Sequence, residues 1–578
     1  MSDLETVGDG KKVVVQHLDQ LGRVRLSRTL EDAAAQSASN EEHGIKVETR
    51  YKTVEGYTYQ LTSNPFRAAT SSGASGEATM GWTLSTAWSS GRRSEVETFS
   101  GSGLPTVFGG SNTNSTGIVR TDIDAERTLV TDQAGKKRIS KTNALGQLKE
   151  VWEILAAGET GSESISFPNT SIAQGFKTTY SYDTLNNLTT VNQGAQTRTF
   201  TYSSLSRLLS AANPESGTIS YEYDPNGNLT RKTDARGVQT DYVYDALNRV
   251  TNRNYSTPGG APANYAATPN VTYFYDNLTN AKGKLIKVSS SVSTTEYTGF
   301  DILGRVTGHK QTTDGQEYTT GYTYNLSGAL VEQTYPSGRV VKNTLDVDGS
   351  LSQVQSAKSG QTLRNYANGF NYNGAGAVTS IRLGNGLWET TQFNSRLQPT
   401  QIGLGQGSAT PNKLKLEYSY GDWNGGSVDA TKNNGNIVKQ VITVPTVGAS
   451  TGFTATQKYY YDSLNRLDDA TEEISSTQTW RQDFSYDRYG NRNFVEANTT
   501  TLLKNCGTSP NFEVCTADIP KVNPVPIAAS NKLTGYTYDS SGNNTTEDAN
   551  EWTYIYDAEN KQVRERGQSC NCAILLFW

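Results

Sequence analysis

The sequence predicts an all-β protein: a long antiparallel meander of β-hairpins whose twist curls the sheet into a spiral or shell. Three observations predict this fold. The composition is low in hydrophobic residues (34%) but contains 54 Gly and 32 Tyr against 15 Phe, which favours strands joined by tight turns and packed by amphipathic aromatic side chains. A short unit with an aromatic pair, an aspartate and an aliphatic residue recurs along the chain. A second turn containing Gly, as in TDARGV from Thr233, separates successive copies.

The repeated unit is clearest between residues 180 and 250 and again from residue 459. It reads YSYDTLNNL from Tyr180, YEYDPNGNL from Tyr221, YVYDALNRV from Tyr242 and YYYDSLNRL from Tyr459. Its two aromatic residues stand at i and i+2, so they share one face of a strand. A spacing of about 21 residues leaves room for two strands and two short loops. We therefore expect each unit to form a strand, a turn, a second strand and a second turn.

The aspartate after the aromatic pair is expected to begin a turn, because its carboxylate can accept a hydrogen bond from the backbone two residues further on. A Gly or Asn three residues later, as in PNGN and RYGN, supplies the positive φ that the turn needs. We assign this structural role to Asp183, Asp224, Asp245, Asp276, Asp462, Asp487, Asp539 and Asp557.

The tyrosines that precede these turns are expected to form an aromatic ladder across neighbouring strands, which we favour over a sugar-stacking platform. The residues are Tyr182, Tyr223, Tyr244, Tyr275, Tyr324, Tyr461, Tyr486, Tyr538 and Tyr556.

Four parts of the chain are expected. Residues 1–120 are a poorly repetitive β or irregular region that could cap or plug one end, residues 121–500 form the repeat shell, residues 501–530 are a Pro-rich loop or linker, and residues 531–578 hold the last repeats and a tail. Cys506 and Cys515 could close a small disulfide loop in an oxidising compartment.

Several function classes are not favoured. A net charge of −5 over 578 residues gives no electrostatic footprint for nucleic acid. The apolar run AILLFW is too short to span a membrane as a helix. His17, His43 and His309 stand singly and no cysteine pair has zinc spacing, so we expect neither a metal nor a cofactor. Glycosidases use one asymmetric pair of carboxylates, whereas the aspartates here are many equivalent copies, so we expect no enzyme.

The repeats YEYDPNGNLTRKTDARGV and YYYDSLNRL resemble the YD repeats of the Rhs family, which are shared with teneurins and with the C component of bacterial insecticidal toxin complexes. The resemblance extends from about residue 120 onward. It implies a β-ribbon wound into a hollow cage that, in bacterial relatives, encloses a C-terminal toxin domain and ends in an autoproteolytic core segment. After YIYDAENKQVRERG this chain runs into QSCNCAILLFW with no recognisable core or toxin, so we assign no autoproteolytic residue and expect a fragment or a truncated reading frame.

The number of repeats predicts an incomplete shell. About fourteen two-stranded units, at roughly 4.8 Å per strand, make a ribbon on the order of 130 Å, which is about one turn of a cage with open edges at its ends.

Two function hypotheses follow. The first is a non-catalytic shell fragment of a polymorphic toxin-type protein, which would enclose or guide a toxin or other protein cargo or join another shell-forming chain. The second is an extracellular or cell-surface scaffold that binds carbohydrate or a receptor through exposed tyrosines and polar loops. The start MSDLETVGDG has no visible signal peptide, so we expect a cytoplasmic protein that is then secreted or displayed by a non-classical route.

Overall fold

The computed structural model describes residues 13–30, 44–161, 163–168, 174–501, 525–547, 552–567 and 573–575. These residues form strands and tight turns, with three short 3₁₀ turns: η2 (Ser72–Gly76), η3 (Thr106–Phe108) and η4 (Ala430–Lys432). Within the described ranges, no helix has the length and apolar character needed to cross a bilayer. The predicted all-β class is confirmed.

A single antiparallel sheet of 37 strands makes up the wall of the molecule. Its first strands are β1 (Val13–Leu18), β2 (Val24–Leu30), β3 (Ile45–Val54), β4 (Tyr57–Ser63), β5 (Gly81–Trp88), β6 (Arg93–Ser100), β7 (Ser115–Asp124), β8 (Arg127–Thr131), β9 (Lys137–Thr142), β10 (Leu148–Ile154), β11 (Glu163–Ser164) and β12 (Gln174–Tyr182). The next are β13 (Leu188–Gln193), β14 (Gln196–Tyr202), β15 (Leu208–Asn213), β16 (Gly217–Tyr223), β17 (Leu229–Thr233), β18 (Gln239–Tyr244), β19 (Val250–Ser256), β20 (Val271–Tyr275), β21 (Leu285–Ser289), β22 (Ser293–Phe300), β23 (Val306–Thr313), β24 (Gln316–Tyr324), β25 (Leu330–Thr334) and β26 (Arg339–Leu345).

The wall continues through β27 (Leu351–Lys358), β28 (Arg364–Tyr372), β29 (Val378–Leu383), β30 (Trp388–Phe393), β31 (Pro399–Gly405), β32 (Leu414–Tyr420), β35 (Ile437–Val444), β36 (Phe453–Tyr461), β37 (Leu467–Ile474), β38 (Thr477–Tyr486) and β39 (Arg492–Phe494). A small hairpin, β33 (Asp422–Asn424) and β34 (Ser427–Asp429), projects between β32 and β35. A separate C-terminal sheet holds β40 (Thr537–Tyr538), β41 (Asn544–Glu547), β42 (Trp552–Tyr556), β43 (Gln562–Gly567) and β44 (Ala573–Leu575).

The strands of the wall pair in chain order, each antiparallel to the next, so the sheet is a continuous meander. In the described part of the chain, β1 pairs only with β2 and β39 only with β38, which leaves both ends as open edges.

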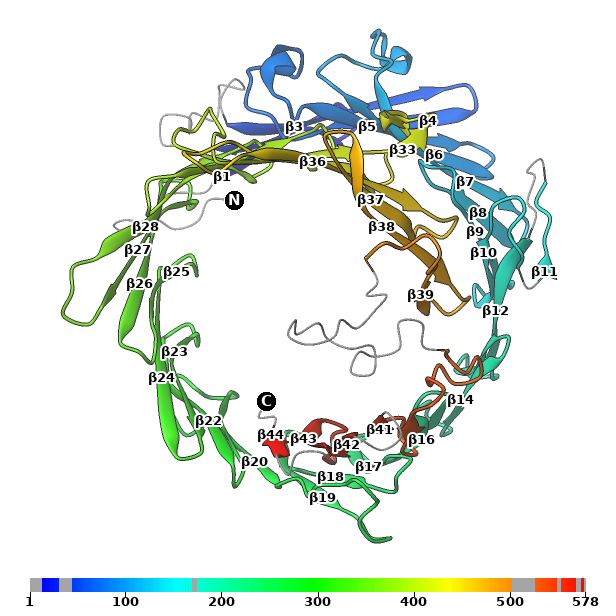
Figure 1. The fold of residues 1–578 in the computed structure, drawn as a ribbon, viewed down its shortest axis with the longest axis vertical. Helices are drawn as coiled ribbons and strands as arrows, with labels where there is room; N and C mark the ends of the chain where they lie inside the picture. The colour runs from blue at the N-terminus through cyan, green and yellow to red at the C-terminus, as the bar shows by residue number, and fades with distance from the viewer. Residues whose placement is uncertain are drawn as a thin grey trace.

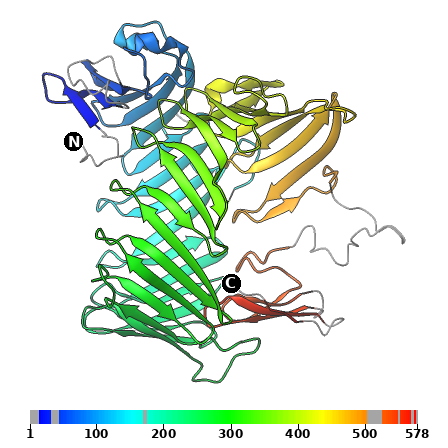
Figure 2. The same cartoon turned by 90° about the vertical axis from the view of Figure 1, so that its left-hand side faces the viewer.

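The wall winds as a spiral around a central space (Figure 1). Strands β36–β39 lie within the outline of β3–β10 in this view, and the side view places β35–β39 and the C-terminal sheet beside the first turn, displaced along the spiral axis (Figure 2). The spiral therefore overlaps itself, and the expectation of about one turn is too low. The physical reason is that β1–β7, from the region that repeats poorly in sequence, belong to the same sheet.

The wall is one sheet thick over most of its length. Strands such as β23 contain no fully buried residue on either face. The accessible surface is 31806 Å², whereas a compact monomer of 62.8 kDa would expose about 20,000 Å². Buried apolar clusters form where connections fold over the sheet, one around Leu61, Phe66 and Trp82 and another around Ile139 and Trp152.

A β-bulge recurs at the same place in the repeats and explains why the sheet curls. Between β18 and β19, Val243 pairs with Asn252 but Tyr244 pairs with Val250, so Thr251 is an extra residue. Bulges bend a strand and increase its twist, and regular repetition accumulates the bend in one direction. The same register shift occurs in the pairs β12–β13, β14–β15, β16–β17, β20–β21, β24–β25, β26–β27, β30–β31 and β36–β37.

Candidate functional site

The turn that follows each aromatic pair is held by its first side chain. Asp245 accepts hydrogen bonds at Oδ1 from the backbone N–H groups of Leu247 (2.9 Å) and Arg249 (3.0 Å), and at Oδ2 from Arg249 Nε (2.8 Å). These bonds, led by the backbone N–H of Arg249, hold the pKa of Asp245 below its ordinary value. Asn248, three residues after the aspartate, has a φ of 59°. The carboxylate of Asp245 therefore stabilises the turn in two ways: Oδ1 binds backbone N–H groups and Oδ2 binds the Arg249 side chain.

Six of the eight predicted aspartates, Asp245 included, begin equivalent turns of two forms. In the first, an Asn four residues later donates Nδ2 to the carboxylate, at 2.7 to 2.9 Å, in Asp183–Asn187, Asp224–Asn228, Asp487–Asn491 and Asp539–Asn543. In the second form, an Arg four residues later donates a hydrogen bond from Nε to the carboxylate, in Asp245–Arg249 and Asp462–Arg466. Asp301–Arg305 has the same form, although Asp301 was not among the predicted aspartates.

The remaining two differ. Asp557 accepts only backbone N–H groups in its turn, from Glu559 (2.8 Å) and Lys561 (2.9 Å). Asp276 begins a longer turn: it has a φ of 72°, accepts from the N–H of Gly283 (2.6 Å) and pairs with Arg249 of the preceding turn (2.9 Å).

The tyrosine before the turn bonds to the preceding repeat through its hydroxyl. Tyr244 Oη donates to the carbonyl of Leu229 at 2.8 Å. The backbone ladder between β17 and β18 begins only at Arg231 and Asp241, so the Leu229 carbonyl lies beyond it. The hydroxyl replaces the ladder donor that this carbonyl lacks. The same bond joins Tyr223 to Leu208, Tyr275 to Val250, Tyr461 to Ile437 and Tyr486 to Leu467, and, outside the predicted set, Tyr372 to Leu351 and Tyr420 to Pro399.

The other predicted tyrosines make different contacts. Lys149 lies over the Tyr182 ring at 5.5 Å and Arg305 over the Tyr324 ring at 4.9 Å. Tyr538 Oη accepts a hydrogen bond from the Leu533 N–H, and the backbone of Tyr556 pairs with Asn264 and Ala266.

The arginine of the turn connects each repeat to the next one. Arg466 binds its own Asp462 through Nε (2.6 Å), donates through Nη1 to the carbonyl of Asp487 (2.9 Å), and lies 4.5 Å from the centre of the Tyr486 ring. Arg305 bridges in the same way to the carbonyl of Asn325. Sequence reasoning missed this relay, although the fixed spacing of four residues between Asp and Arg or Asn was a visible signal.

The two edges of the wall meet at a seam between turns of the spiral. We call the edge formed by the turns after the aromatic pairs, such as 245–249 and 462–466, the Asp rim, and the opposite edge, formed by the turns between repeats, such as 132–136 and 234–238, the link rim. The Asp rim of the second turn lies on the link rim of the first, through contacts between residues 290 to 335 positions apart.

Side chains from both rims build this seam. Arg67 Nη1 donates to the carbonyl of Tyr372 (2.8 Å) and Arg488 Nη2 to that of Lys177 (2.8 Å). Further bonds run from Lys136 Nζ to the Tyr461 carbonyl (3.3 Å), from Ser463 Oγ to Glu159 Oε2 (2.6 Å), from Tyr489 Oη to the Gln193 carbonyl (2.9 Å) and from Gln196 Nε2 to Asn531 Oδ1 (2.8 Å).

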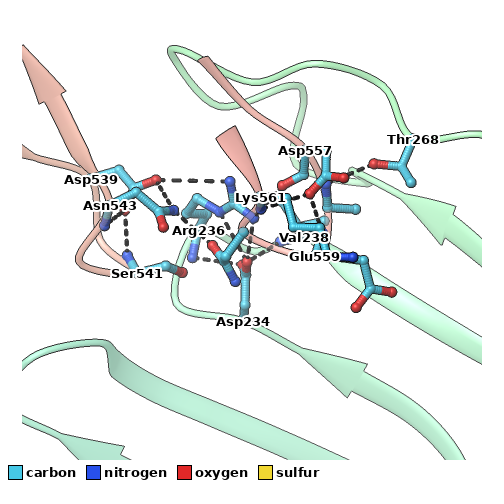
Figure 3. A network of polar contacts seen from close by, with 12 residues as sticks. Asp234, Arg236, Val238, Thr268, Asp539, Ser541, Asn543, Asp557, Glu559 and Lys561 are labelled. Carbon is cyan, nitrogen blue, oxygen red and sulfur yellow. Dashed lines mark hydrogen bonds and ion pairs between the residues drawn. The ribbon is translucent and has the colours of Figure 1, made fainter. Parts of the chain in front are cut away.

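The C-terminal sheet is fastened to the same link rim by a buried arginine (Figure 3). The Arg236 side chain is 2% exposed; its Nη2 lies 2.8 Å from Asp234 Oδ2 and donates to the Asp557 carbonyl at 2.9 Å, while Nη1 lies 3.8 Å from Asp539 Oδ2. Around it, Thr268 Oγ1 accepts from the Ala558 N–H (2.7 Å). Because the sheet has no backbone ladder to β17 or β18, these contacts and a short bridge between Tyr265 and Tyr556 position it.

Two further expectations from the sequence concern a metal site and a disulfide. Among the residues that the structure describes, no three His, Cys, Asp or Glu side chains gather where they could hold a metal ion. His309 lies against the Tyr297 ring, with 5.8 Å between centroids. Cys506, Cys515 and His43 lie outside the described residues.

The comparisons with known proteins agree with the repeat geometry. The sequence model of the RHS Repeat family matches residues 223–261, which contain the turn from Asp245 to Arg249. Residues 223–261 therefore contain an RHS repeat. A search of curated proteins finds no match to the chain.

The solved structures similar to this chain include a Tc holotoxin pore and TcdB2–TccC3 complexes. A mutant Photorhabdus luminescens Tc holotoxin pore matches 97% of the chain at 14% identity, with a TM-score of 0.66, and the TcdB2–TccC3–Cdc42 structure matches 97% at 15% identity, with a TM-score of 0.68. TcdB2–TccC3 without its hypervariable C-terminal region matches at 14% identity and a TM-score of 0.64. The chain covers 28% or 29% of the length of these proteins, and the likeness concerns the fold.

Proposed function

We propose that this RHS-repeat chain is a non-catalytic wall segment of a shell that encloses or guides a protein cargo. The observation that carries the proposal is the seam: the single-layered wall winds past one full turn and fastens its Asp rim to its own link rim, around a central space (Figure 1). A wall sealed between its turns separates the two sides of the sheet, which is what enclosure requires. The Tc toxin structures that share the fold support a toxin as the cargo and a secreted or surface location after export.

The Asp rim of the first turn is the surface through which we propose that a further shell wall docks. The third residue of its turns is apolar and more than half exposed at Leu145, Leu185, Leu205, Leu247 and Leu303. In the second turn the equivalent Leu464 and Tyr489 are half-buried against the link rim. The Asp rim of the first turn thus exposes the same apolar side chains that the link rim covers in the second turn. The link rim of another shell-forming chain could cover them in the same way.

The carboxylates and tyrosines support a structural role. Asp183, Asp224 and Asp301 are engaged by hydrogen bonds within their turns, which hold their pKa values below the ordinary range. The hydroxyls of Tyr223 and Tyr244 donate hydrogen bonds to backbone carbonyls, so these tyrosines are poorly placed to bind carbohydrate. We therefore do not propose the receptor-binding scaffold that exposed tyrosines would serve.

A protection experiment tests the enclosure. A flexible peptide with protease sites is joined after Trp578, and its cleavage is followed in the wild type, in Arg236→Ala, which loosens the seam, and in Arg231→Ala, whose ion pair with Asp241 is partly exposed. We expect slow cleavage in the wild type and in Arg231→Ala and faster cleavage in Arg236→Ala. Equal rates in all three proteins, matching those of the free peptide, would contradict enclosure.

A further inference from the structure

Successive Asp turns of the second spiral turn rest on successive connections of the link rim. The turn from Asp462 reaches the connection after β10, and the turn from Asp487 reaches the next one, after β13. The following Asp turn of the sequence, from Asp539, reaches Arg236 in the connection after β17. It has passed over the connection after β15, so one position on the seam has no Asp turn.

The segment 525–534 takes that position. Gln196 Nε2 donates to Asn531 Oδ1 (2.8 Å), and Asn531 Nδ2 donates to Glu215 Oε1 (3.3 Å), so this segment contacts the link rim on both sides of the pair β14–β15. Figure 1 shows it beside β14, between β39 and β41. The row of turns on the seam is therefore continuous.

Asn531 also makes the bond that joins consecutive regular turns along the Asp rim. In such turns, the Asn four residues after the aspartate donates Nδ2 to the Asn with positive φ in the next turn, as Asn228 does to Asn248 (2.8 Å). Asn491 donates in the same way to Asn531 (3.0 Å), whose φ is 54°. Asn531 thus stands where the fourth residue of a repeat turn belongs.

The residues that follow Asn531 complete a degenerate repeat. A lysine and Leu533 come next, as Arg and Leu follow the Asn of DSLNRL. Tyr538 Oη accepts the N–H of Leu533 (3.0 Å), whereas in a regular repeat the hydroxyl of Tyr486 donates to the carbonyl of the equivalent Leu467 (2.6 Å). The aromatic pair and the aspartate are missing from VPIAASNKL, which is why this stretch resembles a Pro-rich linker in sequence.

The degenerate repeat keeps its place on the seam without continuing the sheet. Among the described residues, its backbone pairing is a single bridge between Pro526 and Leu533. In the same part of the chain β39 pairs only with β38, and β40 pairs only with β41. Between β36 and β37, by contrast, the ladder runs from Ala455 to Tyr461. The strand pairing of the wall is thus interrupted just before the C-terminal sheet.

The contacts that fasten the C-terminal sheet lie on the link rim. They include those of Arg236, the bridge between Tyr265 and Tyr556, and the hydrogen bond from Tyr255 Oη to Glu559 Oε1 (2.5 Å). These contacts can break without disturbing a strand ladder of the 37-stranded wall.

We propose that the C-terminal sheet is a hinged panel, which opens as a unit about the degenerate repeat while the rest of the wall stays closed. Its five strands, at about 4.8 Å apart, would leave an opening of roughly 20 Å. That width admits an extended chain or a single helix but no folded domain, since the radius of gyration of 100 folded residues is already about 13 Å. Use of the panel as an exit for cargo rests on the proposed enclosure, whereas its movement does not.

Hydrogen exchange of the whole chain, followed by mass spectrometry in urea too dilute to unfold the wall, tests the movement. A unit that opens together exposes its amides together. We therefore expect β41, β42 and β43 to share one urea dependence and to exchange at least tenfold faster than β22–β26. Exchange of β41–β43 only together with β22–β26, on global unfolding, would overturn the proposal.

A removable cross-link supplies a second test. Tyr265 and Tyr556 lie opposite each other in a bridge, at a spacing that a disulfide can span. In a chain whose own cysteines are replaced by serine, oxidised Tyr265→Cys/Tyr556→Cys should exchange β41–β43 at least tenfold more slowly than the reduced form. The control pair Val340→Cys/Ala357→Cys, opposite each other in β26 and β27, should show no such difference. Equal exchange in the two redox forms of the first pair would contradict a panel hinged in this way.

The reporter peptide joined after Trp578 separates the panel from the enclosure. Slower cleavage of the peptide in the oxidised than in the reduced form of the first pair supports the panel as the exit. Protection that is equal in both forms means that the panel is not the exit. Cleavage at the rate of the free peptide in both forms defeats the enclosure and the exit together, while the exchange measurements still decide whether the panel moves.

Discussion

Leu247 and Leu464 stand at the same position of nearly identical turns, DALNR and DSLNR, yet their surroundings differ. Leu247, on the Asp rim of the first turn, is 70% exposed, whereas Leu464, one spiral turn later, lines a cavity of about 280 Å³ with Asp132 and Lys136 of the link rim. The local sequence cannot separate the two environments. Position along the spiral determines which rim residues are covered.

The two leucines therefore predict opposite responses to one substitution. Leu464→Asp should lower the free energy of opening of the seam by about 1–3 kcal/mol, because a charge enters an interface beside Asp132. Leu247→Asp should change the stability of the isolated chain by less than about 0.5 kcal/mol. Hydrogen exchange of residues 131–138 measures the difference, and equal exchange in both variants would be inconsistent with the seam.

Arg236 is predicted to hold the C-terminal sheet in place. Arg236→Ala leaves the Asp234 carboxylate, itself 6% exposed, without its buried partner, and such a loss costs about 3–5 kcal/mol. Residues 539–561 should lose protection from hydrogen exchange while β22–β26 keep theirs. Arg231→Ala is the control, since its pair with Asp241 is partly exposed and should contribute less than about 1 kcal/mol. Unchanged protection of residues 539–561 in Arg236→Ala would argue against this role.

The hydrogen bonds from tyrosine hydroxyls to the preceding repeat predict that removing one hydroxyl weakens the pairing of the two strands beside it. Tyr244→Phe keeps the ring but removes the donor to the Leu229 carbonyl, so pairing of β17 with β18 should weaken by about 0.5–1.5 kcal/mol. Tyr318→Phe, in β24, removes the hydroxyl of a tyrosine that is 48% exposed and serves as the control. Amide exchange in β17 and β18 distinguishes the two variants; no acceleration in Tyr244→Phe would mean that the ring alone stabilises the repeat.

Two turns predict pH dependences of opposite sign. Partial burial of its carboxyl group, reinforced by a hydrogen bond with Asp348 and by the charge of Asp348, raises the pKa of Asp346 to about 6 although the residue as a whole stays exposed. An acid whose folded pKa is raised loses stability as the pH increases from its unfolded value of about 3.9 to its folded value. The turn 346–350 should therefore open more readily at pH 7.5 than at pH 5, by less than about 1 kcal/mol because the residue is exposed to solvent.

Asp224 behaves in the opposite way. The side-chain hydrogen bond from Asn228 lowers its pKa, so its contribution is complete above about pH 4 and is lost on further acidification. Hydrogen exchange of both turns, corrected for intrinsic rates, tests the pair. Asp346→Asn should abolish the difference between pH 5 and pH 7.5 in its own turn and leave turn 224–228 unchanged.

The repeat turn was predictable because its chemistry is local. The spacing of Asp245, Asn248 and Val250 contains the acceptor, the positive φ and the restart of the strand. The role of the tyrosine hydroxyl was not predictable in the same way. Tyr244 needs a carbonyl without a ladder partner, and that carbonyl arises from the pairing of three strands around a bulge. Ring packing alone was therefore the expectation.

The seam could not be read from the sequence. Arg236 stands in TDARGV, which has the composition of an ordinary turn, and its partner Asp557 follows 321 residues later. Arg236 and Asp557 meet only because the bends of the successive repeats add up to one full turn of the spiral. The spacing of residues in the sequence does not give the size of the bend at each repeat.

The bend contributed by each bulge also constrains how the length of such a chain can change. Arg67 meets Tyr372, Lys136 meets Tyr461 and Arg236 meets Asp557 at nearly constant separations, so inserting or deleting one repeat within the first turn would displace every later partner by one position. Changes of length should therefore be tolerated in connections that leave the number of bulges unaltered, such as 257–270, and strand pairs should be gained or lost only beyond the last contact between turns. The number of repeats in one turn of the spiral therefore determines the circumference of the wall.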